Sequence, residues 1–442
     1  MSINPRILKG FRDFLPQQES LRQSLIRTLE DGFAAFGFEP IDTPILEYTE
    51  VLLGKGGGET DKQVYRFTDH GKRDVAMRFD LTVPFARYMA LHRNELYLPF
   101  KRYHISKVFR GENTQRGRYR EFTQCDFDIV GTDSASADLE IITMMHHSFR
   151  RLHVPGVEIH VSHRGVFNRL LERYNVREHS EAVLRTVDKL RKVGADATRA
   201  ELADIIGAET ADRVLEFISS RGTMTEVIDT MERLLGGAIP ETERLRHLAV
   251  ALDALELSDD VVIDPSITRG LDYYTGVVFE TFLHGVENIG SVCSGGRYDD
   301  LISLYSKESM PGVGASIGLD RLIAALEELG IAGNSQASAD VLITMQDPQL
   351  LSHYHRIAAT LRSHGIRCEV YPDERKLGQQ FAFAERKHIP FALICGRQEY
   401  DAGTVNVRVL ASRTNLDGIE LSALSPAFLD RYRDDETKSL ES

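Results

Sequence analysis

A cluster of arginines makes the segment FRGENTQRGRYREF, residues 109–122, the part of the sequence best suited to bind an anion. Four arginines fall within it, and residues 101–120 hold seven Lys and Arg against a single acid. The whole chain nevertheless carries a formal net charge of −13, whereas nucleic-acid-binding domains are often basic overall. The positive charge is therefore local, and it suits a small anion or one section of a larger polyanion.

The residues on both sides of this loop alternate as in two β-strands, whose side chains point to opposite faces in turn. In the second strand the apolar face would hold Thr123, Cys125, Phe127 and Ile129, and the polar face Phe122, Gln124, Asp126 and Asp128. We expect an antiparallel pair with one face on a core. Arg110 shares the polar face, and paired arginines bind phosphates in a bidentate manner, which predicts a site for a triphosphate. The alternative is an exposed hairpin whose charges are simply solvated.

Two further segments combine glycines with polar side chains. RGLDYYTGVVFE, residues 269–280, places Tyr273 and Tyr274 between two glycines, with Arg269 directly before the first glycine and an apolar strand after the second. The run from residue 311 to 329 is a glycine-bearing strand that leads into an amphipathic helix, with Arg321 near the start of the helix. Glycines in a strand let other atoms approach the backbone closely, so both segments suit the wall of a ligand site.

A third segment, MRFDLTVPFARYMA at residues 77–90, places Asp80 and Thr82 between a short strand and a helix. Pro84 is compatible with the first turn of that helix. Asp80 suits a ligand pocket, and it suits equally well a helix cap.

A protein-bound metal has little support. The four cysteines lie far apart with no CxxC pair, and no further ligand is evident near His146, His147 and His153. We predict no metal site and cysteines that belong to the core.

The composition is that of a globular protein with more than one domain. The chain has 442 residues, of which 42% are hydrophobic and 27% charged. No run reaches the roughly 18 apolar residues of a membrane span, and the N-terminus lacks the pattern of a secretion signal. We expect a cytoplasmic protein without membrane contact.

The elements that must position these residues fall into two α/β regions with a helical stretch inside the first. We expect a mixed α/β catalytic domain over 1–330, interrupted by a helical insertion at about 170–255. A small, polar linker at 331–339 follows. Alternating strands and helices predict a compact α/β domain at 340–430, and residues 431–442 form a charged tail.

Taken together, these segments resemble the motifs of a class II aminoacyl-tRNA synthetase. GFEPIDTPILEYTE, residues 37–50, resembles the first motif, with Pro44 as its proline; residues 109–122 resemble the second and GVGASIGLDR the third. LDYYTG at 271–276 and GGRYD at 295–299 are similar to signatures of the histidyl-tRNA synthetase family. The resemblance implies an antiparallel sheet flanked by helices, a homodimer, and a C-terminal anticodon-binding domain.

The resemblance also implies roles for individual residues. Arg110 and Arg269 would be catalytic and hold the α-phosphate, and Arg110 would also hold the histidine carboxylate. The implied ATP-binding residues are Arg110, Glu112, Arg118, Phe122 and Arg321. The implied histidine-binding residues are Asp80, Thr82, Arg110, Gln124, Asp128, Arg269, Tyr273 and Tyr274. The implied contacts to the tRNA acceptor end are Asn113, Gln115 and Arg116.

The expected reaction is ATP-dependent attachment of L-histidine to tRNA(His) through histidyl-adenylate, with ATP entering as its Mg²⁺ complex and no tightly bound cofactor. Many bacterial members have Glu-Gly-Thr where this chain has Asp80-Leu81-Thr82, and arginine in place of Asn113. The second difference leaves open whether the extra 5′ guanosine of the tRNA is read. The alternative is a paralogue that regulates ATP phosphoribosyltransferase by sensing histidine, without aminoacylation.

Overall fold

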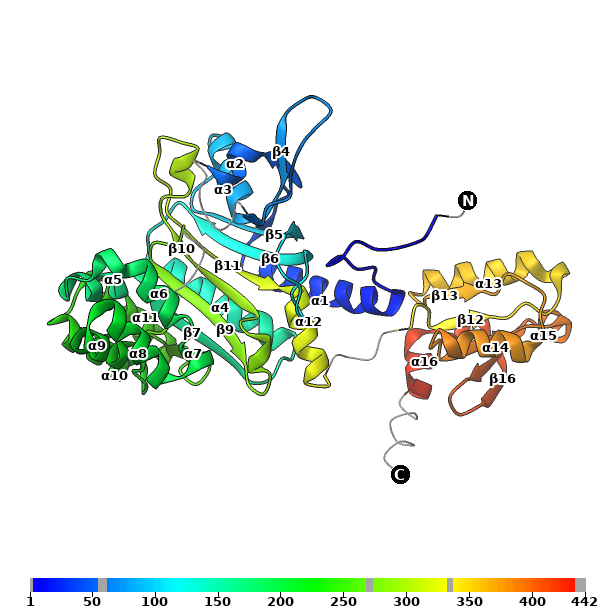
Figure 1. The fold of residues 1–442 in the computed structure, drawn as a ribbon. Helices are drawn as coiled ribbons and strands as arrows, with labels where there is room; N and C mark the ends of the chain where they lie inside the picture. The colour runs from blue at the N-terminus through cyan, green and yellow to red at the C-terminus, as the bar shows by residue number, and fades with distance from the viewer. Residues whose placement is uncertain (1–2, 55–61, 268–272, 332–336, 434–442) are drawn as a thin grey trace. The chain divides into compact units, whose positions relative to one another are not determined.

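The computed structural model describes residues 3–54, 62–267, 273–331 and 337–433. By its internal contacts the chain divides into two units, Met1–Gly333 and Asn334–Ser442 (Figure 1). Each unit has a hydrophobic core of its own. Within the described ranges no helix combines the length and the apolar character needed to cross a membrane.

An eight-stranded sheet forms the centre of the first unit (Figure 1). In spatial order its strands are β1 (Glu39–Pro40), β5 (Phe100–Phe109), β6 (Glu121–Val130), β11 (Gly312–Gly318), β10 (Cys293–Tyr298), β9 (Val277–Leu283), β7 (Val157–His163) and β8 (Val261–Ile263). Neighbouring strands are antiparallel except for the pairs β1–β5 and β7–β8. This large, mainly antiparallel sheet confirms the expected fold class.

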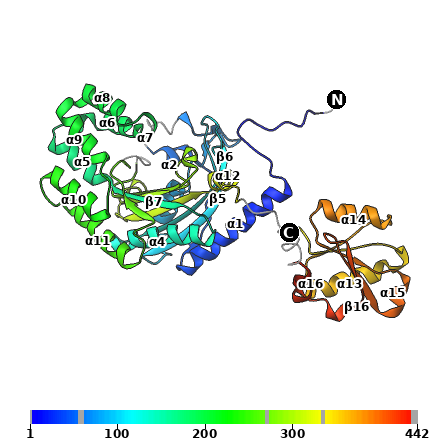
Figure 2. The same cartoon turned by 90° about the horizontal axis from the view of Figure 1, so that it is seen from below.

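Two helices, α1 (Pro16–Ala35) and α4 (Ala135–Arg151), pack on one face of this sheet (Figure 2). Cys125, Phe127 and Ile129 of β6 are buried in the same core as the apolar residues of these helices. The predicted alternation along β6 is therefore confirmed, because the odd-numbered side chains face the helices and the even-numbered ones face away from them.

The opposite side of the sheet carries a smaller three-stranded sheet and the segment that contains Asp80. The small sheet has the order β2 (Leu46–Tyr48), β4 (Asp74–Met77) and β3 (Arg66–Thr68). Helix α2 (Thr49–Leu53) follows β2, and α3 (Thr82–Leu91) follows β4. Helix α12 (Leu319–Glu328) continues directly from β11.

A group of helices lies between β7 and β8 in the sequence and forms one end of the first unit (Figure 1). These are α5 (Arg164–Arg173), α6 (Ser180–Val187), α7 (Leu190–Val193), α8 (Ala195–Ile206), α9 (Ala208–Ile218), α10 (Met224–Leu235) and α11 (Pro240–Ala254). The sequence pattern indicated three helical runs here. The first of them divides into α6 and α7, and α9 and α11 were not among them. Helix α10 ends at Gly236 in the left-handed conformation, as its glycine predicted.

The second unit is a five-stranded sheet with helices. Its strands, in spatial order, are β13 (Cys368–Val370), β12 (Val341–Ile343), β14 (Phe391–Ile394), β15 (Thr404–Val409) and β16 (Thr414–Glu420). The helices are α13 (Leu351–Ser363), α14 (Leu377–Arg386), α15 (Arg397–Ala402) and α16 (Pro426–Arg433). The first three strands are parallel and the last two are added antiparallel. Strand β16 carries no regular alternation and was not predicted. Much of the expected linker and tail, residues 332–336 and 434–442, lies outside the described residues.

Candidate active site

A cleft of about 410 Å³ opens on the face of the large sheet that turns away from α1 and α4. Its walls come from β6, β9, β10, β11, the loop before β6 and the start of α12. The lining includes Thr82, Arg110, Glu112, Arg118, Phe122, Gln124, Tyr273, Tyr274 and Arg321. The fold thus brings most of the predicted ATP and histidine residues to one cavity.

One end of the cleft is a cluster of arginines. Burial, together with the nearby charges of Arg118 and Arg110, lowers the pKa of Arg321 to about 10. Arg110 is half-buried, and the resulting desolvation lowers its pKa; its guanidinium lies 4.3 Å from the ring centroid of Phe79 and 5.0 Å from that of Phe122. Arg118 is exposed and the other two are partly buried, so the cluster is open to an incoming ligand, and three cations held together favour a ligand with several negative charges.

Gly117 explains how the loop delivers Arg118 to this cluster. Its backbone has φ +71°, a conformation that residues with a Cβ rarely adopt, and a Cβ there would lie 3.3 Å from the Cα of Arg321. The loop tip therefore rests against α12, which places the arginine after the glycine beside the arginine on the helix.

The other end of the cleft is a buried polar pocket built on paired strands. The register of β5 and β6 sets Arg102 opposite Asp128. The Nη2 atom of Arg102 lies 2.6 Å from Asp128 Oδ2, and the hydroxyl of Tyr298 donates to Asp128 Oδ1 at 2.5 Å. The guanidinium of Arg102 and the carboxylate of Asp128 are both buried, so each offsets the desolvation cost of the other's charge.

Gln124 leaves an unused acceptor at this end of the cleft. Its Nε2 donates to Ser316 Oγ at 2.8 Å, whereas its buried Oε1 has no hydrogen-bond partner among the described residues. Buried polar atoms are normally paired, so an unpaired oxygen in a cleft wall suits a ligand that brings an N–H group.

Asp80 closes the pocket and also caps α3. Its Oδ1 accepts the backbone N–H of Val83 at 2.9 Å, and its Oδ2 accepts the hydroxyl of Tyr273 at 3.5 Å. Burial raises the pKa of this carboxyl. The capping contact is therefore observed, whereas Asp80 itself is not among the residues that line the cleft and reaches it through Tyr273, which is.

Comparison with known proteins shows to which family these motifs belong. The family model described as histidyl-tRNA synthetase matches residues 10–322, and the model described as anticodon binding domain matches residues 340–430. The chain belongs to the histidyl-tRNA synthetase family. Among curated relatives, the histidine–tRNA ligase of Treponema denticola is 50% identical over 425 residues, which cover 93% of this chain and 95% of the relative. The histidine–tRNA ligase of Rhodopirellula baltica is 46% identical over 421 residues, covering 94% of this chain and 95% of the relative.

Solved structures agree with this family. The crystal structure of histidyl-tRNA synthetase from Nostoc sp. PCC 7120 covers 98% of this chain and 100% of its own, at 30% identity and a TM-score of 0.87. A structure from Bacillus halodurans titled ATP phosphoribosyltransferase regulatory subunit/histidyl-tRNA synthetase covers 87% of this chain and 97% of its own, at 22% identity and a TM-score of 0.73. The second likeness shows the fold alone.

The remaining residues that the family resemblance implied lie elsewhere. Asp80 and Asp128 are buried and are not among the residues that line the cleft. Asn113, Gln115 and Arg116 are exposed on the loop of the second motif, outside the cleft lining, and Arg116 Nη1 lies 2.7 Å from Glu328 Oε2. Arg269 falls outside the described residues.

Sequence reasoning missed several residues of the site. Arg102 is on the polar face of β5, and the alternation that selected Arg110 eight residues later would have selected it too. Burial raises the pKa of its neighbour Asp126 to about 7, although the charge of Arg102 opposes this. Glu280 and Ser294 line the cleft from paired positions on β9 and β10. Glu280 ends the segment 269–280 but was given no role from the sequence, and Ser294 lies outside the motifs.

Proposed function

We infer that this protein attaches L-histidine to tRNA(His) at the expense of ATP, through histidyl-adenylate. The observation that carries the inference is that Arg110 connects the two ends of the cleft. Its charge interacts with Asp80 in the polar pocket and with Glu112 on the phosphate side. A single guanidinium between an anion site and an amino-acid pocket suits a reaction that joins a carboxylate to a phosphate.

The ATP half of the site uses the arginine cluster. Arg110 would hold the α-phosphate, and Arg118 and Arg321 the terminal phosphates, by bidentate hydrogen bonds. Phe122 offers a ring for stacking on adenine, and Glu112, which also lines the cleft, would lie near the adenine. Arg269 is proposed as a second donor to the α-phosphate, from the family motif alone.

The histidine half uses the polar pocket. Asp80 and Thr82 would bind the amino group, while Tyr274, Asp128 and the free oxygen of Gln124 would bind or orient the imidazole. Tyr273 is held next to Tyr274, with ring centroids 5.0 Å apart, and would fix Asp80 through its hydroxyl.

In this arrangement the chain positions the reactants and neutralises their charge. The histidine carboxylate attacks the α-phosphorus in line, the bond to pyrophosphate breaks, and Arg110 stabilises the charge on the phosphoryl oxygens. The 3′-hydroxyl of the tRNA then attacks the adenylate carbonyl and releases AMP. No side chain needs to form a covalent intermediate.

ATP is proposed to enter as its Mg²⁺ complex. No group of three or more His, Cys, Asp and Glu side chains suited to a metal occurs among the residues that the structure describes. Such a sparse donor set fits Mg²⁺, which keeps several waters and is held by substrate phosphates with one or two carboxylates. Glu280 in the cleft lining would supply such a carboxylate. The bound ion would neutralise charge on the outer phosphates.

The partner sites are proposals as well. Asn113, Gln115 and Arg116 are exposed and would meet the acceptor end of the tRNA, and the domain at 340–430 would bind the anticodon. A cytoplasmic homodimer is proposed from the first motif. Its support is a group of exposed apolar side chains on the small sheet, namely Leu46, Tyr48 and Phe67.

ATP–pyrophosphate exchange with each of the twenty amino acids tests this function. Exchange with histidine alone is the expected result. Exchange with none of them would favour the regulatory paralogue, and exchange with another amino acid would contradict the assignment of the pocket.

A further inference from the structure

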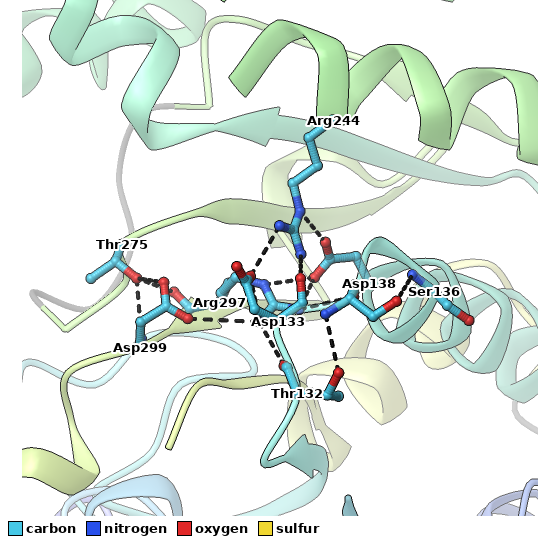
Figure 3. Close-up of polar contacts among 9 residues, drawn as sticks. Thr132, Asp133, Ser136, Asp138, Arg244, Thr275, Arg297 and Asp299 are labelled. Atoms are coloured by element: carbon cyan, nitrogen blue, oxygen red, sulfur yellow. Dashed lines mark hydrogen bonds and ion pairs between the residues drawn. The ribbon is translucent and has the colours of Figure 1, made fainter. Parts of the chain in front are cut away.

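A buried ion-pair cluster lies behind the histidine pocket, on the α4 side of the sheet (Figure 3). Arg297 of β10 donates to Asp138 Oδ1 of α4 from Nε at 3.0 Å and from Nη2 at 2.7 Å. Arg297 is 1% exposed and Asp138 is 0% exposed. None of these residues lines the cleft, so the proposed reaction does not account for them.

The helical insertion joins this cluster through one side chain. Arg244 reaches from α11 to Asp138 Oδ2, which accepts from its Nε at 2.6 Å (Figure 3). The Nη1 and Nη2 atoms of Arg244 donate to the side chain and the carbonyl of Asp133, each at 3.0 Å. Asp138 therefore divides its two oxygens between an arginine of the sheet and an arginine of the insertion.

Strand β10 carries the effect of this cluster to the pocket. Successive side chains on a strand face opposite sides, so Arg297 points back to α4 while its neighbours Gly296 and Tyr298 face the site. A Cβ on Gly296 would lie 2.9 Å from Cδ1 of Tyr274, which shows how closely that ring lies on the strand. The hydroxyl of Tyr298 holds Asp128. A shift of Arg297 would thus move two pocket contacts at once.

The corner that carries the two pocket tyrosines is also tied to Arg297. The carbonyl of Arg297 accepts the backbone N–H of Thr275 at 2.8 Å. The hydroxyl of Thr275 donates to Asp299 Oδ2 at 2.7 Å, and Asp299 Oδ1 lies 3.6 Å from Arg297 Nη1 (Figure 3). Thr275 directly follows Tyr274, so the cluster restrains the end of the tyrosine segment.

We propose that Arg244, Asp138 and Arg297 form an insertion bridge through which the helical insertion positions Tyr273 and Tyr274 for histidine, with Arg244 as a positioning residue. The proposal rests on the proposed function for its substrate. Loss of Arg244 leaves one oxygen of a buried carboxylate without its cation, which weakens the hold on Arg297. The ATP end of the cleft does not depend on this bridge.

The test compares Arg244→Met with Arg246→Met. Arg246 lies two residues further along α11 and pairs with Asp229 and Glu232 inside the insertion, so its variant controls for loss of an arginine ion pair on the same helix. In pyrophosphate exchange, Arg244→Met should raise the histidine KM by about 3- to 30-fold, a range typical of coupled side-chain networks. The ATP KM should stay within twofold, and Arg246→Met should change neither.

Hydrogen exchange on the ligand-free protein supplies a readout that needs no catalysis. Amides of the peptide from 273 to 283 should exchange faster in Arg244→Met than in wild type, and at the wild-type rate in Arg246→Met. If wild type fails to exchange pyrophosphate with histidine, the proposed function is wrong, and the hydrogen-exchange comparison still decides the bridge.

Asp299→Asn provides a second variant, because Asp299 is partly exposed and links the Thr275 hydroxyl to Arg297 without contacting Arg244 or Asp138. If Arg244→Met does not fold, Asp299→Asn takes its place as the test, and it should also raise the histidine KM. Unchanged histidine KM and unchanged exchange in a folded Arg244→Met protein would overturn the proposal. Equal increases in the KM for histidine and for ATP would do so as well.

Discussion

Gly314 of β11 gives the sharpest test of how the histidine pocket is packed. A Cβ built there would lie 2.1 Å from Asp128 Oδ1 and 2.7 Å from the carbonyl oxygen of Phe127. Gly314→Ala must therefore push the Asp128 carboxylate by more than an ångström, away from the Tyr298 hydroxyl at 2.5 Å and the Arg102 guanidinium at 2.6 Å. The methyl group costs overpacking energy and also disturbs a buried ion pair.

Overpacking costs about 1–3 kcal/mol, and loosening the ion pair adds to it, so we expect a loss of about 3 kcal/mol. The unit Met1–Gly333 has an unfolding entropy of about 0.7 kcal/mol/K at the average value per residue, which converts this loss to a fall in Tm of about 4 °C. The histidine KM should rise at least tenfold, because a shift of Asp128 disturbs the imidazole site directly.

Gly318→Ala on the same strand is the matched control for Tm. The nearest atom to a Cβ there is 3.7 Å away, and φ is −79°, so alanine fits. Thermal melting followed by pyrophosphate exchange at varied histidine compares the two variants. A Tm for Gly314→Ala within about 1 °C of wild type, together with an unchanged histidine KM, would refute the packing that we describe for Asp128; 1 °C corresponds to under about 1 kcal/mol here.

Four further predictions concern the site and the two units. Arg110→Ala should abolish pyrophosphate exchange, because the α-phosphate loses a donor that matters most in the transition state, and near-normal activity of the folded variant would remove Arg110 from the site. Tyr274→Phe should raise the histidine KM by about 5- to 150-fold, the equivalent of about 1–3 kcal/mol for one buried hydrogen-bond partner, and an unchanged KM would make Tyr274 a wall residue. The pKa of Asp126 is raised to about 7 by burial, so the folded chain retains a proton that the unfolded chain loses near pH 4, and folding stability falls as pH rises through this window. Asp126→Asn should therefore gain Tm relative to wild type as pH rises from about 4 to about 7, and a pH-independent difference would contradict this. Cutting within residues 330–339 should leave a fragment that activates histidine but charges tRNA poorly, since it loses one of two tethered contacts, and full charging at low tRNA concentration would argue against the second unit as a tRNA-binding module.

Local patterns in the sequence determined a large part of this protein. The alternation after residue 121 predicted which side chains of β6 face the core. Successive side chains of a strand point to opposite faces, so burial of one face gives the sequence a period of two. The motifs at 37–50, 109–122 and 312–321 predicted a class II synthetase, and hence the antiparallel sheet, and the signatures at 271–276 and 295–299 predicted the family. Glycines at 312 and 314 predicted a close approach to the backbone. The structure shows that the approaching groups are Tyr298 and Asp128.

Tertiary structure alone decided which residues meet. Arg102 and Asp128 are paired because the register of β5 on β6 sets them opposite each other, and alternation specifies a face without specifying a register. The insertion bridge joins Asp138 to residues 106 and 159 positions away in the chain. Such contacts depend on how whole elements pack. The periodic pattern of a sequence predicts that a side chain faces the core. Which residues it contacts there is determined by the packing of the other elements.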